Sequence, residues 1–205
     1  MLKEKFILLT RKFSQDDSII DSCREEIAEN YSGKKRHYHN LSHLENLFAE
    51  LEPLRPQIGD WDAVAFSVFY HDLIYDAKKS DNEEQSALRA EQRLNSLSVP
   101  AAIISHCNEI ILATKSHSVS SDNDINLFTD ADLSILGKSW PEYEVYYKQI
   151  REEYSIYPDL LYKPGRRKVL KHFLEMERIF KTDFFREKYE VQARVNLGME
   201  LERIS

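Results

Sequence analysis

Apolar residues recur at intervals of three and four along most of the chain, a spacing that predicts amphipathic helices. The first clear helix is expected over about 16–31, ahead of a stop at Gly33, with an apolar face of Ile19, Ile20, Cys23, Ile27 and Tyr31. A second is expected to begin after Asn40, which is a good N-cap, and to end before Pro53. The N-terminal half therefore opens with at least two helices.

The segment from about Trp61 to Tyr75 is apolar nearly all round, which predicts a central helix covered by its neighbours. Another helix should open at Asp81, which forms a capping-box pattern with Glu84, and continue through residue 94. A further helix is expected from about Pro100 to His117, before a polar, loop-like stretch over 118–124. The remaining helices fit about 140–156, 165–180 and 183–204. We therefore expect an all-α fold.

The 205 residues contain only 5 Gly and 6 Pro, which also favours helices over a turn-rich β fold. No repeat or Pro/Gly/Ser-rich linker divides the chain, so we expect a single-domain helical bundle over 1–205, with helices 140–204 packing on the rest. Cys23 and Cys107 are far apart and form neither a disulfide framework nor a zinc-finger motif. The longest apolar stretch, Ala63 to Tyr70, is too short for a membrane helix, so a cytoplasmic protein without a membrane partner is expected.

The formal net charge of −7 and the pI near 5.6 argue against a broad surface for duplex nucleic acid. A small anionic substrate would need only a local group of cations, and residues 34–36 and Arg166-Arg167 are candidates. Either group could instead be an ordinary solvated surface. The oligomeric state stays open, a homodimer included.

Histidine is unevenly distributed, with three of the seven histidines between positions 37 and 43. His71 is followed by Asp72 near the end of the most apolar helix, where an unpaired charge is costly unless a partner or a metal compensates it. Taken alone, this pair would also fit a buried aspartate hydrogen-bonded to backbone or to histidine.

Five short motifs extend the pattern in a fixed order over about residues 31–137: Arg36-x-Tyr38-His39-Asn40-x-x-His43, Phe69-Tyr70-His71-Asp72, Asp81-Asn82-Glu83-x-x-Ser86-Ala87, Ala113-Thr114-x-x-His117 and Asp130-Ala131-Asp132-Leu133. The set resembles the HD superfamily, and more closely its predicted metal-dependent phosphohydrolases. The resemblance extends to Arg166, Arg167 and the run 190–197. It implies an HD-type helical domain whose metal is bound by His43, His71, Asp72 and Asp132.

Two histidines and two carboxylates suit one divalent transition metal, Mn²⁺, Fe²⁺, Ni²⁺, Co²⁺ or Zn²⁺, with Mg²⁺ as a further option. A second metal is not expected, because His106 and His117 on one helix would lie about 16 Å apart. The last ligand has an alternative in Asp130. We prefer Asp132 because the small-Asp-x-Leu context matches the family, and Asp130 would then cap the helix or contact a ligand.

The remaining motif residues have candidate roles in catalysis. His117 is the candidate general acid or substrate contact, and Glu83 could position the attacking water or merely complement the first turn of its helix. His39 could orient His43. Contact with the substrate is expected from Arg36, whose guanidinium could hold a phosphate, and from Tyr38 and Lys115.

Two groups of residues are left outside this assignment. His106 is expected to be an ordinary surface or packing histidine. Arg194 and Asn196 stay open between contact with the substrate and helix packing.

The predicted reaction is hydrolysis of a phosphate ester or anhydride by a metal-activated water, acting on a small phosphorylated metabolite or a nucleotide. A nucleotide-binding regulatory HD domain without catalysis is one alternative. A di-iron oxygenase of the HD type is less favoured because the extra histidine pair is missing.

Overall fold

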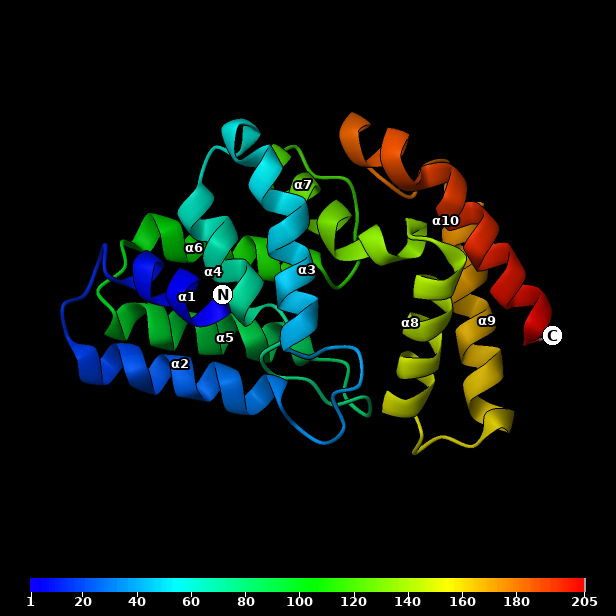
Figure 1. Cartoon of the computed structure of the whole chain (residues 1–205), viewed down its shortest axis with the longest axis horizontal. Helices are drawn as coiled ribbons and strands as arrows, with labels where there is room; N and C mark the ends of the chain where they lie inside the picture. Colours follow the sequence, from blue (N-terminus) through cyan, green and yellow to red (C-terminus); the bar gives the residue numbers. More distant parts are fainter. Residues whose placement is uncertain (205) are drawn as a thin grey trace. The chain divides into compact units, whose positions relative to one another are not determined.

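In a computed structural model that describes residues 1–204, the chain is all-α and contains no strand within that range, as expected (Figure 1). Contacts group the chain into two compact units, one of Met1–Thr129 and one that begins at Asp130. The expected single domain stays a prediction. None of the described helices is both long and apolar enough to cross a membrane.

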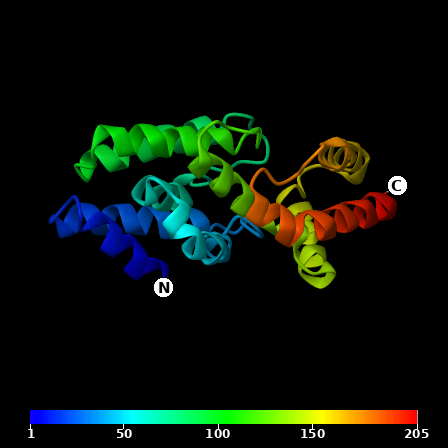
Figure 2. The same cartoon turned by 90° about the horizontal axis from the view of Figure 1, so that it is seen from above.

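The first unit is built around α4 (Trp61–Tyr70), in which every residue from 63 to 70 is buried. Helix α4 contacts α3, α5 and α6. Figure 2 shows α5 and α6 on one side of α4, and α1 and α2 on the other. The other elements of this unit are α1 (Leu2–Thr10), α2 (Asp17–Tyr31), α3 (Leu41–Leu51), η1 (Glu52–Gln57), α5 (Asn82–Ser96), α6 (Ala101–Ala113) and most of α7 (Asn123–Asp132).

The predicted start of α3 is confirmed in detail. Asn40 is its N-cap, and the Asn40 side chain accepts a hydrogen bond of 2.9 Å from the Ser42 N–H. This bond satisfies one of the main-chain donors that a helix leaves free at its first turn. The predicted capping box at Asp81 is not formed, because the Asp81 carboxylate accepts instead from the side-chain amide of Gln85, at 3.1 Å.

Helix boundaries differ from the expectations in three places. Helix α4 ends at Tyr70 rather than near Tyr75, because the groups that follow bond to other segments of the chain. Helix α9 (Asp159–Glu175) begins earlier than 165, with Pro164 inside it. The N-terminal helix α1 was not among the expected helices, because its short apolar run gives no clear helical period.

The second unit contains η2 (Leu133–Gly137), α8 (Trp140–Glu153), α9 and α10 (Asp183–Arg203). Gly137 allows η2 to approach α10 closely, since a Cβ atom at this position would clash with Tyr189. The fully buried Asn196 of α10 donates to the carbonyls of Leu136 and Lys138, both at 2.8 Å. Asn196 therefore has a packing role, which resolves one of the two positions that were left open.

Arg194 resolves the other open position in the same way. Its guanidinium donates to the carbonyl oxygens of Leu174, Met176 and Glu177, and to the carboxylate of Glu190. These bonds attach the end of α9 to α10, which assigns Arg194 to helix packing.

Candidate metal centre

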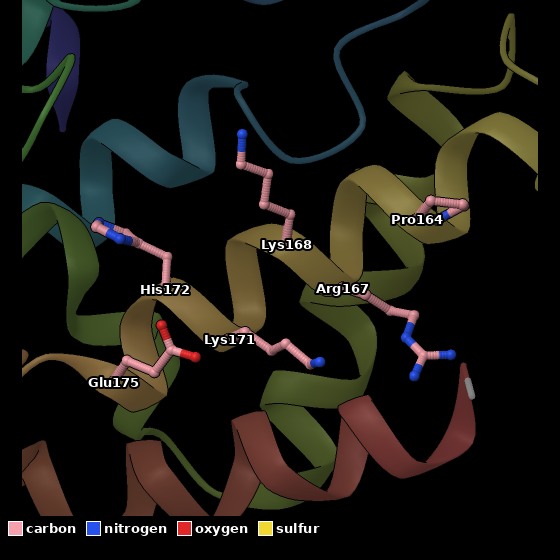
Figure 3. A pocket seen from close by; sticks show the side chains of 6 residues that line it. All are labelled: Pro164, Arg167, Lys168, Lys171, His172 and Glu175. Carbon is pink, nitrogen blue, oxygen red and sulfur yellow. The ribbon is translucent and has the colours of Figure 1, made fainter.

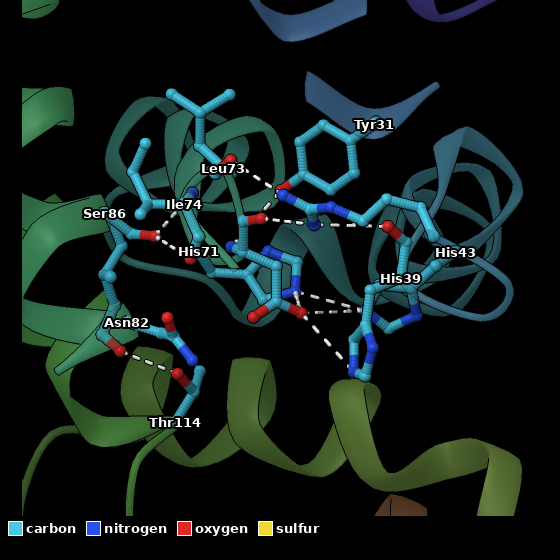
Figure 4. A network of polar contacts seen from close by, with 12 residues as sticks. Tyr31, His39, His43, His71, Leu73, Ile74, Asn82, Ser86 and Thr114 are labelled. Atoms are coloured by element: carbon cyan, nitrogen blue, oxygen red, sulfur yellow. Dashed lines mark hydrogen bonds and ion pairs between the residues drawn. The ribbon is translucent and has the colours of Figure 1, made fainter. Parts of the chain in front are cut away.

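Two histidines meet where α3 begins and α4 ends (Figure 4). His43 lies in the first turn of α3 and is 3% exposed, and His71 is the C-cap residue of α4 and is 1% exposed. Asp72, the next residue, lies just beyond the helix with 17% exposure. The three side chains therefore face a common point at the rim of the core.

The nitrogens of the two imidazoles face each other directly. His43 Nε2 lies 3.1 Å from His71 Nε2, and Asp72 Oδ2 lies 3.2 Å from His71 Nε2 and 4.0 Å from His43 Nε2. Ligands about 2.1 Å from one ion are roughly 3.0–3.4 Å apart in octahedral or tetrahedral geometry. The histidine pair thus has the spacing of two ligands of one metal, although without an ion the same distance allows one N–H···N hydrogen bond.

The orientation of His71 favours metal binding by Nε2. Its Nδ1 lies 3.2 Å from the Val68 carbonyl oxygen, one turn earlier in α4. When Nδ1–H donates to that carbonyl, the lone pair of the neutral ring is on Nε2, the atom that faces His43. The Phe128 ring forms a T-shaped contact with the His71 ring, with centroids 5.6 Å apart, and helps to fix its plane.

The residues of the first unit therefore fit a metal ion by their donor set. A second group of the first unit, His106, Asp122 and Asp124, could also hold a metal ion, because its ligand atoms all lie within 4.8 Å of one another. Imidazole nitrogen combined with carboxylate oxygen suits divalent transition metals.

The two aspartates at the end of α7 differ in their partners. Asp130 is fully buried and accepts hydrogen bonds from the main-chain N–H groups of Lys181 and Thr182 and from the Thr182 hydroxyl, at 2.8–3.0 Å. It therefore holds the two residues that precede α10 and does not cap its own helix. Asp132 is half-buried, and its assignment as the last metal ligand stays a prediction.

The turn after α4 is held by main-chain hydrogen bonds to distant side chains. The Asp72 N–H donates to the Tyr31 hydroxyl at 3.2 Å, and the Ile74 N–H donates to the Ser86 hydroxyl at 3.0 Å. Asn82 exchanges two hydrogen bonds of 3.0 Å with the main chain of Asp76. The motif at 81–87 thus fixes the loop that carries Asp72.

Arg36 has a different role from the expected phosphate contact. Its terminal nitrogens donate to the carbonyls of Asp72, at 2.6 Å, and Leu73, at 2.8 Å, and one of them also to the His39 carbonyl. Its guanidinium lies over the rings of Tyr31 and Tyr75. Because the fork is occupied by main-chain oxygens, Arg36 joins the loop before α3 to the loop after α4, and the prediction of a phosphate fork is not supported.

The other predicted residues before α3 lie around the histidine pair. His39 Nε2 is 3.8 Å from Asp72 Oδ2, and its ring lies against Tyr75. His39 thus faces the carboxylate, while its ring centre is 5.8 Å from that of His43. The Tyr38 ring contacts the rings of His39 and His43, with centroids 5.0 Å apart in each case.

The other predicted catalytic and substrate residues lie in α5 or later in the chain. His117 lies beyond the end of α6 with a φ of 49°, a left-handed conformation that is uncommon for a side chain with a Cβ. Glu83 is half-buried in the first turn of α5. Lys115 donates to the Ser80 carbonyl at 2.8 Å and also to the Glu84 carboxylate. The hydrogen bond to Glu84 raises the pKa of Lys115. Their catalytic or substrate roles stay predictions.

The two predicted cationic residues of α9 separate in the structure. Arg166 is buried and forms a bidentate ion pair with Glu200, at 2.7 and 2.9 Å. Arg167 lines a hollow on α9 together with Lys168, Lys171, His172 and other residues of the helix (Figure 3). Of these two arginines, only Arg167 is therefore available to an anion.

Sequence reasoning missed the group around His106, which was expected to be an ordinary histidine. The signal that could have revealed it is the pair of helix-capping positions at Asp60 and Asp122, but their approach to His106 depends on tertiary packing.

No protein-family model, curated protein or solved structure matches this chain. The HD resemblance therefore rests on the sequence motifs, and the chemistry of the site rests on the geometry described above.

Proposed function

We propose that this chain is a metal-dependent phosphohydrolase of the HD type, with a small phosphorylated metabolite or a nucleotide as substrate. The observation that carries the proposal is the buried pair of facing Nε2 atoms of His43 and His71, 3.1 Å apart, with the Asp72 carboxylate beside them. The ordered HD-like motifs supply the reaction type.

His43, His71, Asp72 and Asp132 are the proposed ligands of one divalent transition metal. Such an ion, when bound, supplies a nucleophilic water at neutral pH and polarises a phosphoryl oxygen. The chain provides a rigid donor set, because His71 is oriented by Val68 and the Asp72 loop is held by Arg36, Tyr31 and other partners.

The carboxylate and the buried imidazoles contribute to cation binding in different ways. The Asp72 carboxylate offsets part of the charge of a cation, which neutral imidazoles cannot do. The nearly complete burial of both histidines keeps bulk water from competing for their lone pairs. His117 is proposed to hold the proton for the leaving group, and Glu83 to orient a water.

The di-iron oxygenase alternative requires a second metal next to the first. The other group of candidate ligands includes His106, whose neighbour Asp60 caps the N-terminus of α4, whereas His71 caps its C-terminus. Eleven residues of helix separate these ends by about 16 Å. Two ions at these places would not share a bridging carboxylate, so a hydrolase is the better explanation.

The proposal is tested by elemental analysis of the purified protein, followed by assays of phosphorylated metabolites and nucleotides with Mn²⁺, Co²⁺, Ni²⁺ and Mg²⁺. His43→Gln is the diagnostic variant, and His37→Gln is its matched control because His37 is an exposed histidine outside the ligand set. We expect hydrolysis, and the ion bound at His43 and His71, to be lost only in His43→Gln.

Phosphate release that is equal in the wild type and His43→Gln would contradict the proposal. So would wild-type protein that binds metal and nucleotides tightly but hydrolyses none of the substrates, which would favour the regulatory alternative.

A further inference from the structure

A second group of ligand-type side chains lies in the first unit, at the N-terminal end of α4. His106 of α6 lies between two aspartates, with Nε2 3.2 Å from Asp122 Oδ2 and Nδ1 3.7 Å from Asp60 Oδ2. Asp124, in the first turn of α7, offers a further ligand atom within 4.8 Å of those of His106 and Asp122. Three potential ligands from α6 and the start of α7 therefore meet at one place, while Asp60, at the start of α4, faces the other ring nitrogen of His106.

Main-chain hydrogen bonds fix the three carboxylates in position. Asp60 Oδ1 accepts from the Ala63 N–H at 3.0 Å, and Asp122 Oδ1 accepts from the Asp124 N–H at 2.8 Å. The buried Asp124 accepts from the N–H groups of Gly59, at 2.9 Å, and Asp60, at 2.7 Å. Since these bonds use the Oδ1 atoms of Asp60 and Asp122, their Oδ2 atoms remain directed at His106.

The charge of this group has no lysine or arginine partner within the described residues. Among the ion pairs of the described residues, none joins a lysine or arginine to Asp60, Asp122 or Asp124, so His106 is their one basic neighbour. Three carboxylates this close repel one another unless a cation lies between them.

The contact between His106 and Asp122 also differs from a hydrogen bond. His106 Nε2 is shielded from solvent and makes no hydrogen bond within the described residues, although Asp122 Oδ2 is only 3.2 Å away. That separation is within the roughly 3.0–3.4 Å expected for two ligands of one ion. An ion between the two atoms would satisfy both of them.

We propose that His106, Asp122 and Asp124 form a second divalent-cation site, separate from the one at His43 and His71, with Asp60 orienting the His106 ring from its Nδ1 side. One imidazole and several carboxylates suit Mn²⁺ or Zn²⁺ better than Ca²⁺, which prefers oxygen ligands alone. The bound ion links the middle of α6 to the start of α7, and Asp60 connects both to the start of α4 through Asp124 and His106. Because α4 also carries His71, the ion stabilises the support of the first site from its far end.

The test uses Mn²⁺ as the probe in the full-length protein with both His43 and His71 changed to glutamine. Calorimetric titration should show one Mn²⁺ still bound, and pulsed electron paramagnetic resonance should show a coordinated imidazole nitrogen. Adding His106→Gln should weaken Mn²⁺ binding at least tenfold and remove the nitrogen signal. Asp62→Asn, a change in the first turn of α4 outside the group, should leave both measurements unchanged.

Variants that fold poorly are covered by a second measurement. In the His43/His71 double variant, Mn²⁺ should raise the thermal unfolding midpoint, and Asp122→Asn should reduce that increase. Absence of Mn²⁺ binding in the double variant, or binding unaffected by His106→Gln, would overturn the second site. If wild-type protein binds only one Mn²⁺, sensitive to His106→Gln alone, the second site stands and the proposed function fails.

Discussion

In the second unit, the buried charges neutralise one another, whereas at the end of α4 three imidazoles surround one carboxylate. Arg166 and Glu200, 9% and 1% exposed, form a bidentate pair, and Tyr143 donates to the same carboxylate. In the first unit, the Nε2 atoms of His39, His43 and His71 lie 3.2–4.0 Å from Asp72 Oδ2. The first arrangement is complete without a ligand, and the second has the form of a binding site.

This difference indicates how buried polar groups in the two units should respond to substitution. A satisfied pair contributes to folding, because removal of one partner leaves the other charge buried and unpaired. Ligand groups directed at a common point repel or crowd one another without an ion, so their removal should affect binding more than folding. The following predictions test that distinction.

The largest effect is expected from Asp72→Ala. The variant should lose the ion bound at His43 and His71 and should no longer hydrolyse the phosphorylated substrate, because the Asp72 carboxylate both binds that cation and offsets its charge. Glu83→Ala is the comparison, with a loss no greater than the roughly 10- to 100-fold that follows from removing an outer partner of a metal site. Elemental analysis and steady-state kinetics measure both. Equal losses in the two variants would show that Asp72 is not a ligand.

Arg166→Met should destabilise the protein by about 3–5 kcal/mol, because it leaves the Glu200 carboxylate buried without its partner. Urea unfolding of metal-free protein measures the change. Asp72→Asn, measured in the same way, should change the metal-free stability by less than about 1 kcal/mol. If the Asp72 variant is as destabilised as the Arg166 variant, the histidine cluster is structural and the contrast between the two regions disappears.

The sequence was sufficient to predict the elements on which the candidate site depends. The all-α class, the N-cap at Asn40 and the central position of α4 followed from local spacing, because helical periodicity and capping depend on residues close in sequence. The motifs also singled out His43 and His71, which the structure brings together.

Tertiary contacts decide what the sequence could not predict. Arg36 binds carbonyls 36 and 37 residues further along the chain, and Arg166 pairs with an acid 34 residues away. Both looked like candidates for anion binding, because a local pattern shows that a cation is present but not which partner it meets. The early end of α4 and the group around His106 have the same cause.

A smaller effect is expected from the two aspartates of α7. Asp132→Asn should weaken metal binding by at least the roughly 10- to 100-fold that follows from removing an outer partner of a metal ligand, because Asp132 is itself a proposed ligand. Asp130→Asn should leave metal affinity unchanged and lower stability by about 1–3 kcal/mol, because it weakens the bonds to Lys181 and Thr182. Metal titration and urea unfolding of both variants measure the two effects. The reverse pattern would make Asp130 the ligand.

The smallest effect is expected on α9, where the second unit has charge that it does not neutralise. Arg167, Lys168 and Lys171 line one hollow, and the described residues supply no ion pair to any of them (Figure 3). A double change of Arg167 and Lys171 to glutamine should weaken binding of pyrophosphate a few-fold, because exposed ion pairs are worth less than about 1 kcal/mol each.

Calorimetry with metal-free protein measures this binding at low and high salt, and the difference between variant and wild type should shrink as salt screens the charges. Lys148→Gln is the matched control, because Lys148 already pairs with Glu144 on α8. Binding that is unchanged in the double variant, or weakened equally by Lys148→Gln, would identify the α9 cations as an ordinary solvated surface. In that case neither the buried nor the exposed cations discussed for this unit would bind a ligand.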